Sequence, residues 1–402
     1  MWSRFFRKRS IIFCFDKLIS LSIVILVIIN ALSGLSVESN SFNIDFIPYT
    51  VVSIFRHLLS IVGIICFIYR GVSIKYFLFL LPLLFLFFIS LSIHPDNEQL
   101  NLTTGVFIRN IALVFYFITI QNFEWLYKYM LKASVAYFVF LLCFILYITI
   151  NGFLHTYSFL INYMHYAYSM LPFILIHIYD IYRRNNIISI LIFLFYFSTI
   201  CVCGCRGAIV CALFYIIILF ARYCIMNKKY FKLARSICFF IAFLFFVLFS
   251  IKDIYYFLNE NGIDSHVITK LATAQDFRSV TSSRSLFYTK ILDKLEMNPC
   301  EFNGINANYT LLGIYCHNII LELLYDFGGL FGSIIIVLLF LLTLKTLVSP
   351  SNTVKTEMTI YFFVISGVKL LFSFSLYNDL WLLFWFMLLI SSPQKTRYAN
   401  KC

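Results

Sequence analysis

The sequence predicts an all-α fold in which about twelve helices cross a lipid bilayer and one large loop joins the ninth helix to the tenth. Three observations lead to this fold class. Hydrophobic residues make up 62% of the 402 residues, aromatic residues 20% and charged residues only 12%. An ordinary soluble domain carries roughly 25% charged residues, so much of this chain needs a cover of lipid.

The predicted helices correspond to apolar runs long enough to cross, or nearly cross, a hydrocarbon core that needs about 20 helical residues. The runs lie near residues 18–34, 47–69, 74–93, 105–120, 126–150, 163–181, 186–204, 207–225, 233–252, 319–344, 357–374 and 376–393. Basic residues precede the first run and no small-residue cleavage site follows it, so we expect this run to be retained as a span.

Lys and Arg residues assign the two sides of the membrane, because loops that face the cytoplasm carry an excess of them. With the basic amino terminus inside, basic clusters fall on alternate connections and both termini face the cytoplasm. The opposite connections 36–45, 92–101, 151–162 and 376–379 contain no Lys or Arg. Topology therefore explains the net charge of +13, and no nucleic-acid partner is expected.

Residues 253–318 form the large extracytoplasmic segment, between a membrane domain at 1–252 and a second one at 319–402 that ends in a cytoplasmic tail. Within this segment the spacing of Leu286, Ile291 and Leu295 predicts a short amphipathic helix that ends at Asn298 and Pro299. The alternative is a disordered connector, which the apolar pattern and the aromatic residues of the segment disfavour.

The cysteine spacing and the absence of known catalytic motifs limit the reactions that this protein is expected to catalyse. Cys201, Cys203 and Cys205 are spaced two apart, which is unusual for a structural zinc site, and we expect no metal and no cofactor. The usual signatures of nucleotide hydrolysis, zinc hydrolysis and serine acyl transfer are missing from the sequence. Cys300 and Cys316 fall in the extracytoplasmic segment, where an oxidising compartment allows a disulfide, but the sequence leaves that bridge open.

Two arginines in or near external loops are candidates for binding an anion. Arg206 lies in the turn CGCRGA between two apolar runs, where a fixed charge must be solvated, paired or matched to an anionic ligand. The alternative is that the Arg206 side chain extends to the lipid headgroups and has no functional role. Arg284 lies near the start of the predicted loop helix, with Arg278 six positions earlier, and taken alone both are ordinary surface residues.

His317 and Asn318 lie where the large loop returns to the membrane. Asn318, Glu322 and Asp326 recur every four residues and therefore share one face of the tenth predicted helix. Carboxylates in the first turns suit a helix N-terminus, and they are also placed to orient the histidine or to bind a hydroxyl group of a ligand. The alternative is a structural histidine followed by a capping asparagine.

Three further charges, Arg56, Arg109 and Lys369, lie within apolar runs, where a charge is costly and is usually paired or functional. Arg109 is near the extracytoplasmic end of its run and is therefore a candidate member of an anion site. A structural role is the alternative for each.

These features together resemble the O-antigen polymerase and O-antigen ligase superfamily. The resemblance rests on about twelve spans, the arginine turn, the long loop with SSRS and NP, and above all the run HNIILELLYDFGGLFG. Its motifs lie within residues 201–210 and 278–332. It implies metal-independent glycosyl transfer at the periplasmic face of the bacterial inner membrane, from a glycan donor on undecaprenyl pyrophosphate to an acceptor glycan.

The resemblance also implies roles for particular residues. Arg206 and Arg284 match the family arginines that stabilise the pyrophosphate leaving group. His317 matches the family histidine, which takes the proton of the attacking hydroxyl or holds the acceptor in line. The substrate-binding candidates are Asn318, Glu322, Arg109 and Arg278.

The run HNIILELLYDFGGLFG favours a polymerase, which joins a growing lipid-linked chain to the next lipid-linked repeat unit and can work with a chain-length regulator. The runner-up is a ligase, which passes the finished glycan to a lipid A core sugar. A hypothesis of another class is a lipid-linked glycan flippase or transporter, which requires a charged central pathway and has no need of a large external loop.

Overall fold

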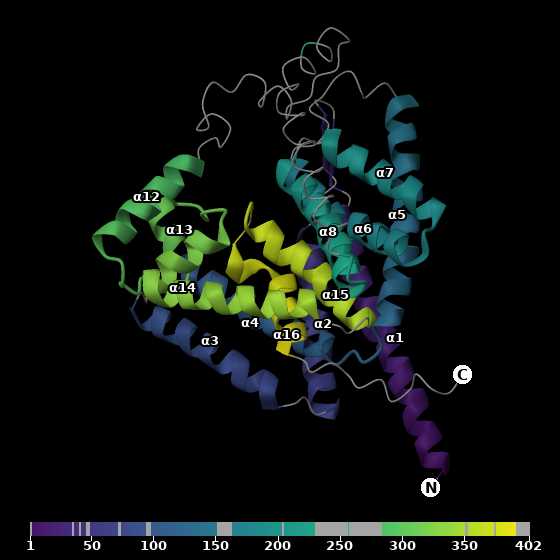
Figure 1. Cartoon of the computed structure of the whole chain (residues 1–402), viewed down its shortest axis with the longest axis horizontal. Coiled ribbons are helices and arrows are strands. Elements are labelled where there is room, and N and C mark those ends of the chain that lie inside the picture. The colour runs from purple at the N-terminus through teal and green to yellow at the C-terminus, as the bar shows by residue number, and fades with distance from the viewer. Residues whose placement is uncertain are drawn as a thin grey trace. The chain divides into compact units, whose positions relative to one another are not determined.

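The structure is a computed structural model of the whole chain. It describes residues 2–33, 36–39, 42–45, 49–70, 74–93, 98–150, 163–202, 205–229, 256, 284–349, 353–373 and 375–390. Helices dominate these residues, so the all-α expectation is confirmed for the described part of the chain (Figure 1). The ninth expected span and residues 257–283, which include Arg278, lie outside the described residues.

Each apolar run of the first half is helical. The helices are α1 (Trp2–Ser33), α2 (Tyr49–Arg70), α3 (Ile74–Ile93), α4 (Glu98–Phe117) and α5 (Phe123–Ile150). Helix α4 begins seven residues before the apolar run that predicted it, because its first turns are polar. Strands β1 (Ser36–Ser39) and β2 (Phe42–Asp45) pair antiparallel between α1 and α2, and this hairpin was not predicted.

The later apolar runs that the structure describes are helical as well, whereas the short helix Ala307–Leu312 was not predicted. The later helices are α6 (Tyr163–Arg184), α7 (Ile187–Val202), α8 (Arg206–Met226), α12 (Arg284–Met297), α13 (Ala307–Leu312), α14 (Ile319–Val348), α15 (Val354–Phe363) and α16 (Leu380–Ile390), with a π-helical turn η2 (Val364–Val368) and a 3-10 turn η3 (Leu376–Asn378). Helix α12 is the helix of the large loop segment. It stops at Met297, before the Asn298-Pro299 pair.

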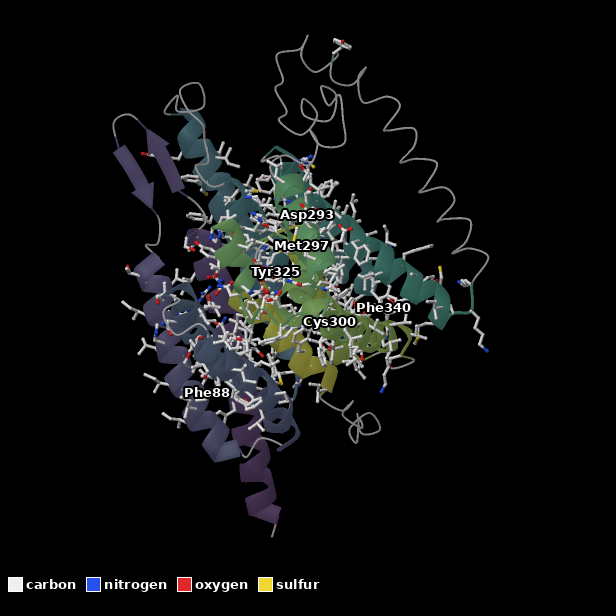
Figure 2. The ribbon with its side chains drawn as sticks, turned by 90° about the vertical axis from the view of Figure 1, so that its left-hand side faces the viewer. Phe88, Asp293, Met297, Cys300, Tyr325 and Phe340 are labelled. Atoms are coloured by element: carbon white, nitrogen blue, oxygen red, sulfur yellow. The ribbon has the colours of Figure 1, made fainter. Side chains whose placement is uncertain are left out.

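Five of the described helices contain a stretch long and apolar enough to cross a membrane. These stretches are Phe15–Ser33, Leu100–Phe117, Phe123–Tyr147, Arg206–Met226 and Ile319–Val348. Shorter apolar stretches occur at Thr50–Ile65, Leu84–Ile93, Ile187–Cys201 and Leu380–Ile390. Phe88 on α3 and Phe340 on α14, labelled in Figure 2, are 68% and 64% exposed, as expected of side chains that face lipid. The chain is therefore a membrane protein.

The chain folds as two compact units. Unit 1 comprises Met1–Ile23, Phe55–Tyr129 and Asn298–Cys402, and unit 2 comprises Val24–Ile54 and Met130–Met297. In unit 1, α16 packs against α4 and α15 (Figure 1). Phe384 of α16 forms T-shaped contacts with Phe117 at 5.6 Å and with Phe362 at 4.7 Å. Aromatic packing of this kind holds apolar helices together where lipid removes the hydrophobic driving force between them.

The core of unit 2 is the packing of α6 against α7 and α8, together with α5. The Ser134 hydroxyl is 2.8 Å from His177 Nε2, and the Tyr196 hydroxyl donates to the Ser134 carbonyl at 2.7 Å. Asp180 accepts from the Ser189 hydroxyl at 2.6 Å and so fixes the short connection between α6 and α7. Buried polar groups on three helices are thus paired within the unit, as an apolar surrounding requires.

Helix α14 is broken at Gly328, whose φ of 76° and ψ of 157° are not helical. The first half of the helix, with Tyr325, meets the segment that contains Cys300, and both residues are labelled in Figure 2. A Cβ atom at Gly328 would lie 2.8 Å from the Glu301 carbonyl oxygen, and one at Gly332 would lie 2.5 Å from the Leu323 carbonyl oxygen. The glycines of FGGLFG therefore allow the break and the close approach of backbone on both sides of it.

Replacing Gly328 by Ala tests the break. The alanine must adopt a conformation that costs about 1–3 kcal/mol, and its Cβ meets backbone that cannot move freely. We expect a lower apparent Tm in detergent micelles. Gly105→Ala on α4 is the matched control, because nothing lies within 4 Å of a Cβ at that position. An unchanged Tm for Gly328→Ala would contradict the broken helix.

Candidate functional site

His317 directly precedes α14 and has a left-handed backbone, with a φ of 61°. This conformation is uncommon for a residue with a side chain, and it is found where surrounding contacts impose it. The His317 ring lies 4.3 Å from the ring of Tyr315, and the residue is only 9% exposed. Asn318 is the N-cap of α14, since its Oδ1 accepts hydrogen bonds from the backbone N–H groups of Ile320 and Leu321 at 2.9 and 3.2 Å.

Glu322 lies one turn into α14 and is 1% exposed. The Ser375 hydroxyl donates to its Oε1 at 2.7 Å, and the Leu376 backbone N–H donates to its Oε2 at 2.9 Å. Both oxygens of this carboxylate are thus used within unit 1. Glu322 therefore joins the start of α14 to the turn η3.

Asp326 follows one turn later and is completely buried. Its Oδ2 accepts from the Tyr377 hydroxyl at 2.7 Å and from the Asn306 backbone N–H at 2.9 Å. Its Oδ1 accepts from the backbone N–H and from the side-chain amide of Asn308, both at 3.3 Å. Its backbone carbonyl accepts from the Gly304 N–H at 3.1 Å. We call Glu322, Asp326, Asn308, Ser375 and Tyr377 the carboxylate cluster.

The carboxylate cluster reaches His317 through the neighbouring residue Cys316. The Asn308 amide that donates to Asp326 also accepts from the Cys316 backbone N–H, at 3.3 Å. The Cys316 thiol donates to the Asn318 carbonyl at 3.1 Å. The residues on both sides of His317 are therefore fixed by hydrogen bonds, which accounts for its left-handed backbone.

Arg109, the other candidate in unit 1, lies on α4 where that helix crosses α2. The Ser60 hydroxyl of α2 approaches the Arg109 carbonyl at 3.4 Å. The neighbouring Asn110 side chain donates to the Asn378 carbonyl of η3 at 3.4 Å. The intramembrane Lys369 is paired with Asp379, which follows Asn378, so a structural role accounts for that charge.

Arg206 and Arg284 both belong to unit 2, where each is the first residue of a helix, α8 and α12 respectively. Burial raises the pKa of the Cys205 thiol, and the charge of Arg284 opposes that rise. The charge of Arg284 thus affects the pKa of Cys205, the residue before Arg206, although the two arginines are far apart in sequence.

The helix ends at these arginines strengthen the case for an anion. A helix N-terminus carries a partial positive charge, so a cation there is disfavoured by about 0.3–1 kcal/mol, and lysines and arginines prefer the other end. Two arginines at two N-termini are thus in an arrangement that does not serve helix stability. Backbone N–H groups and guanidinium groups together form the usual setting for phosphate.

The remaining sequence predictions concern Arg278, the cysteines and metal binding. Arg278 and Cys203 lie outside the described residues. Cys300 is exposed and Cys316 buried, and both are free thiols, so no disulfide joins them. Within the described ranges, no group of three or more His, Cys, Asp or Glu side chains is positioned to hold a metal ion. Sequence reasoning missed Asn308, Ser375 and Tyr377, because nothing local marks them as partners of the acidic residues of α14.

Comparisons of this chain with family models, with curated proteins and with solved structures found no match.

The two loop cysteines provide a test of this geometry. Burial raises the pKa of Cys316 to about 12, so at pH 7.5 only about one thiol in thirty thousand is the reactive thiolate. We expect maleimide to modify Cys300 and to spare Cys316 in the native protein, with both modified after denaturation, as read by peptide mass spectrometry. Rapid native labelling of Cys316, or a requirement for reductant before Cys300 reacts, would contradict the structure.

Proposed function

We propose that this protein is a membrane glycosyltransferase that joins glycan repeat units carried on undecaprenyl pyrophosphate, as an O-antigen or related surface-polysaccharide polymerase. One observation carries the proposal. Arg206 and Arg284 are each the first residue of a helix, and both helices belong to unit 2. Two guanidinium groups beside two helix N-termini favour a polyanionic ligand, and pyrophosphate is the polyanion that this reaction releases.

In the proposed reaction, a hydroxyl oxygen of the acceptor sugar attacks the anomeric carbon of the donor glycan. The bond from that carbon to the pyrophosphate oxygen breaks, and undecaprenyl pyrophosphate leaves. Arg206 and Arg284 stabilise the negative charge that collects on the leaving group. His317 accepts the proton of the attacking hydroxyl. Side chains handle both the charge and the proton, so the proposal includes no metal ion and no cofactor.

The acceptor side of the proposal draws its support from the preorganisation of His317. A catalytic base needs a fixed position, and the carboxylate cluster holds the residues that flank His317. Glu322 is a positioning residue in this account, since both of its oxygens are bonded within the protein. Asn318 is half-buried and caps α14 with its side-chain oxygen, and in this account its amide nitrogen binds the acceptor sugar.

The proposal includes a topology of about twelve spans with both termini in the cytoplasm of a bacterium. Residues 253–318 then lie on the periplasmic side of the inner membrane, where the lipid-linked substrates are presented. The alternation of basic and non-basic connections supports this topology, as do the five helices long and apolar enough to span a bilayer. The partners are the lipid-linked donor, the acceptor glycan and a chain-length regulator.

The most direct test is a lipopolysaccharide gel from a strain that lacks this gene. We expect a core band that carries one repeat unit and no ladder, because ligation continues without polymerisation. Loss of every glycan-bearing core band would identify the ligase instead. An unchanged ladder would contradict both enzymes and favour a transporter or another polysaccharide.

Complementation of that strain tests the residues. Arg206→Ala and Arg284→Ala should lower glycan transfer by about a hundredfold or more, because each removes a charge that stabilises the leaving group. His317→Gln retains a hydrogen-bonding side chain but accepts no proton, so it too should not restore the ladder. Arg184→Ala is the control, since Arg184 is half-exposed on α6 of unit 2. A full ladder with His317→Gln would remove the proposed role of the histidine.

A further inference from the structure

The apolar stretches of α1 and α5 begin next to each other in unit 1. Asp16, near the start of the stretch Phe15–Ser33, accepts a hydrogen bond at its Oδ1 from the Gln121 backbone N–H, at 3.1 Å. Gln121 lies two residues before the stretch Phe123–Tyr147. Both stretches therefore start at the same surface of the bilayer, at the level of the lipid headgroups.

Two lysines approach one indole ring at this surface. The Lys17 Nζ of α1 lies 4.4 Å from the centroid of the Trp125 ring of α5, and the Lys128 Nζ lies 5.3 Å from it. Because both distances end at one centroid, the two ammonium nitrogens are at most about 10 Å apart. Lys128 is exposed, and the ring of Tyr129 lies 5.8 Å from the indole. The surface thus combines cations with the aromatic residues that favour the headgroup level.

The two chain segments that contain these lysines have an excess of positive charge. Residues 1–17 and 121–129 include six Lys or Arg, and their two acidic residues are Asp16 and Glu124. Four of the six basic residues precede the apolar stretch of α1, on a helix that begins at Trp2. Even with both carboxylates counted, the excess is of the kind that attracts anionic lipids to the end of a membrane-spanning helix.

Topology alone does not account for the position of the two lysine side chains. Orientation in the membrane requires basic residues on one side, but it does not require lysines of two helices to share one ring. A phosphate near both ammonium groups offsets their mutual repulsion, because its negative charge attracts each of them. Leu18 and Leu21, in the next turn of α1, are 49% and 43% exposed and offer apolar surface to acyl chains.

We propose that Lys17, Trp125 and Lys128 form a binding site for the headgroup of an anionic phospholipid. The two ammonium groups bind the lipid phosphate, and the indole packs against the glycerol backbone. In the topology proposed above, this lipid belongs to the cytoplasmic leaflet, opposite the side of His317. The lipid is a bound partner of unit 1 and takes no part in the proposed reaction, so the inference stands or falls independently of the enzyme activity.

Lipid retention by the purified full chain tests the site. The protein is reconstituted in nanodiscs of phosphatidylcholine with a minor fraction of phosphatidylglycerol, transferred to detergent, and analysed for bound lipid by native mass spectrometry. The wild type should retain phosphatidylglycerol in preference to phosphatidylcholine. Lys17→Gln/Lys128→Gln should lower that preference at least about tenfold, because both cations at the headgroup are lost.

The matched control is Lys290→Gln/Lys294→Gln, which removes the same charge from two exposed positions on α12. This variant should retain phosphatidylglycerol as the wild type does. An equal preference for phosphatidylglycerol in the wild type and in Lys17→Gln/Lys128→Gln would overturn the proposal.

Tryptophan fluorescence locates the lipid without removing a lysine. Bromine atoms on an acyl chain, close to the glycerol, quench an indole that they contact. The same mixture of the two lipids is used twice, with bromine on phosphatidylglycerol or on phosphatidylcholine. Quenching of the wild type should be stronger, relative to the amount of brominated lipid, with brominated phosphatidylglycerol. Trp125→Phe keeps an aromatic ring at that position and should remove the difference. Equal quenching of the wild type by the two brominated lipids would overturn the proposal.

Glycerol phosphate is the probe for a site that takes the anion alone. It carries the phosphate but has no acyl chains to lie along α1, so it should displace bound phosphatidylglycerol far less effectively than a short-chain phosphatidylglycerol does. Equal displacement by the two competitors would show a site for the free anion, and would overturn the assignment to a lipid.

Discussion

The carboxylate of Asp326 is completely buried near the start of an apolar helix, and its oxygens must therefore be paired within the protein. The donors come from two distant places, the Asn306–Asn308 segment and Tyr377 of η3. Burial of the Asp326 carboxylate without these hydrogen-bond donors would be energetically very unfavourable. The loop before α14 and the turn η3 before α16 are therefore fixed relative to Asp326. Much of the organisation around His317 in unit 1 depends on this requirement.

Two features of the chain make the arrangement possible. The break at Gly328 ends the first half of α14 after Asp326, and Gly329 donates to the Pro299 carbonyl at 2.6 Å, which anchors the start of the same loop. The Asn308 side chain then connects Asp326 to Cys316, because it donates to the carboxylate and accepts from the Cys316 backbone N–H. His317 is thus held in a left-handed conformation by hydrogen bonds of its neighbours, among them the link between Asn308 and Asp326, which are 18 positions apart, and not by any local preference.

The sequence predicted what depends on local chemistry. Apolar runs marked the described helices because a chain in lipid must satisfy its backbone within each helix, and the Asn298-Pro299 pair marked the end of α12. The four-residue spacing identified the acidic face of α14, but its partners Ser375 and Tyr377 come from a distant turn that no local pattern indicates. The break at Gly328 was not predicted, since glycine is also common in continuous membrane helices. The approach of α2 to α4, where the Ser60 hydroxyl lies 3.4 Å from the Arg109 carbonyl, depends on which helices cross, and a single sequence does not determine that.

Hydrogen exchange of the purified protein, followed by mass spectrometry, tests the role of Asp326 most directly. Asp326→Asn keeps the size of the side chain but replaces one accepting oxygen by an NH2 group, which then faces a hydrogen-bond donor. We therefore predict faster amide exchange confined to residues 304–317 and 375–378. Asp293→Asn, at an exposed position on α12, should leave exchange as in the wild type. Unchanged exchange at 304–317 in Asp326→Asn would contradict the account, because the loop that carries His317 would then be held by something else.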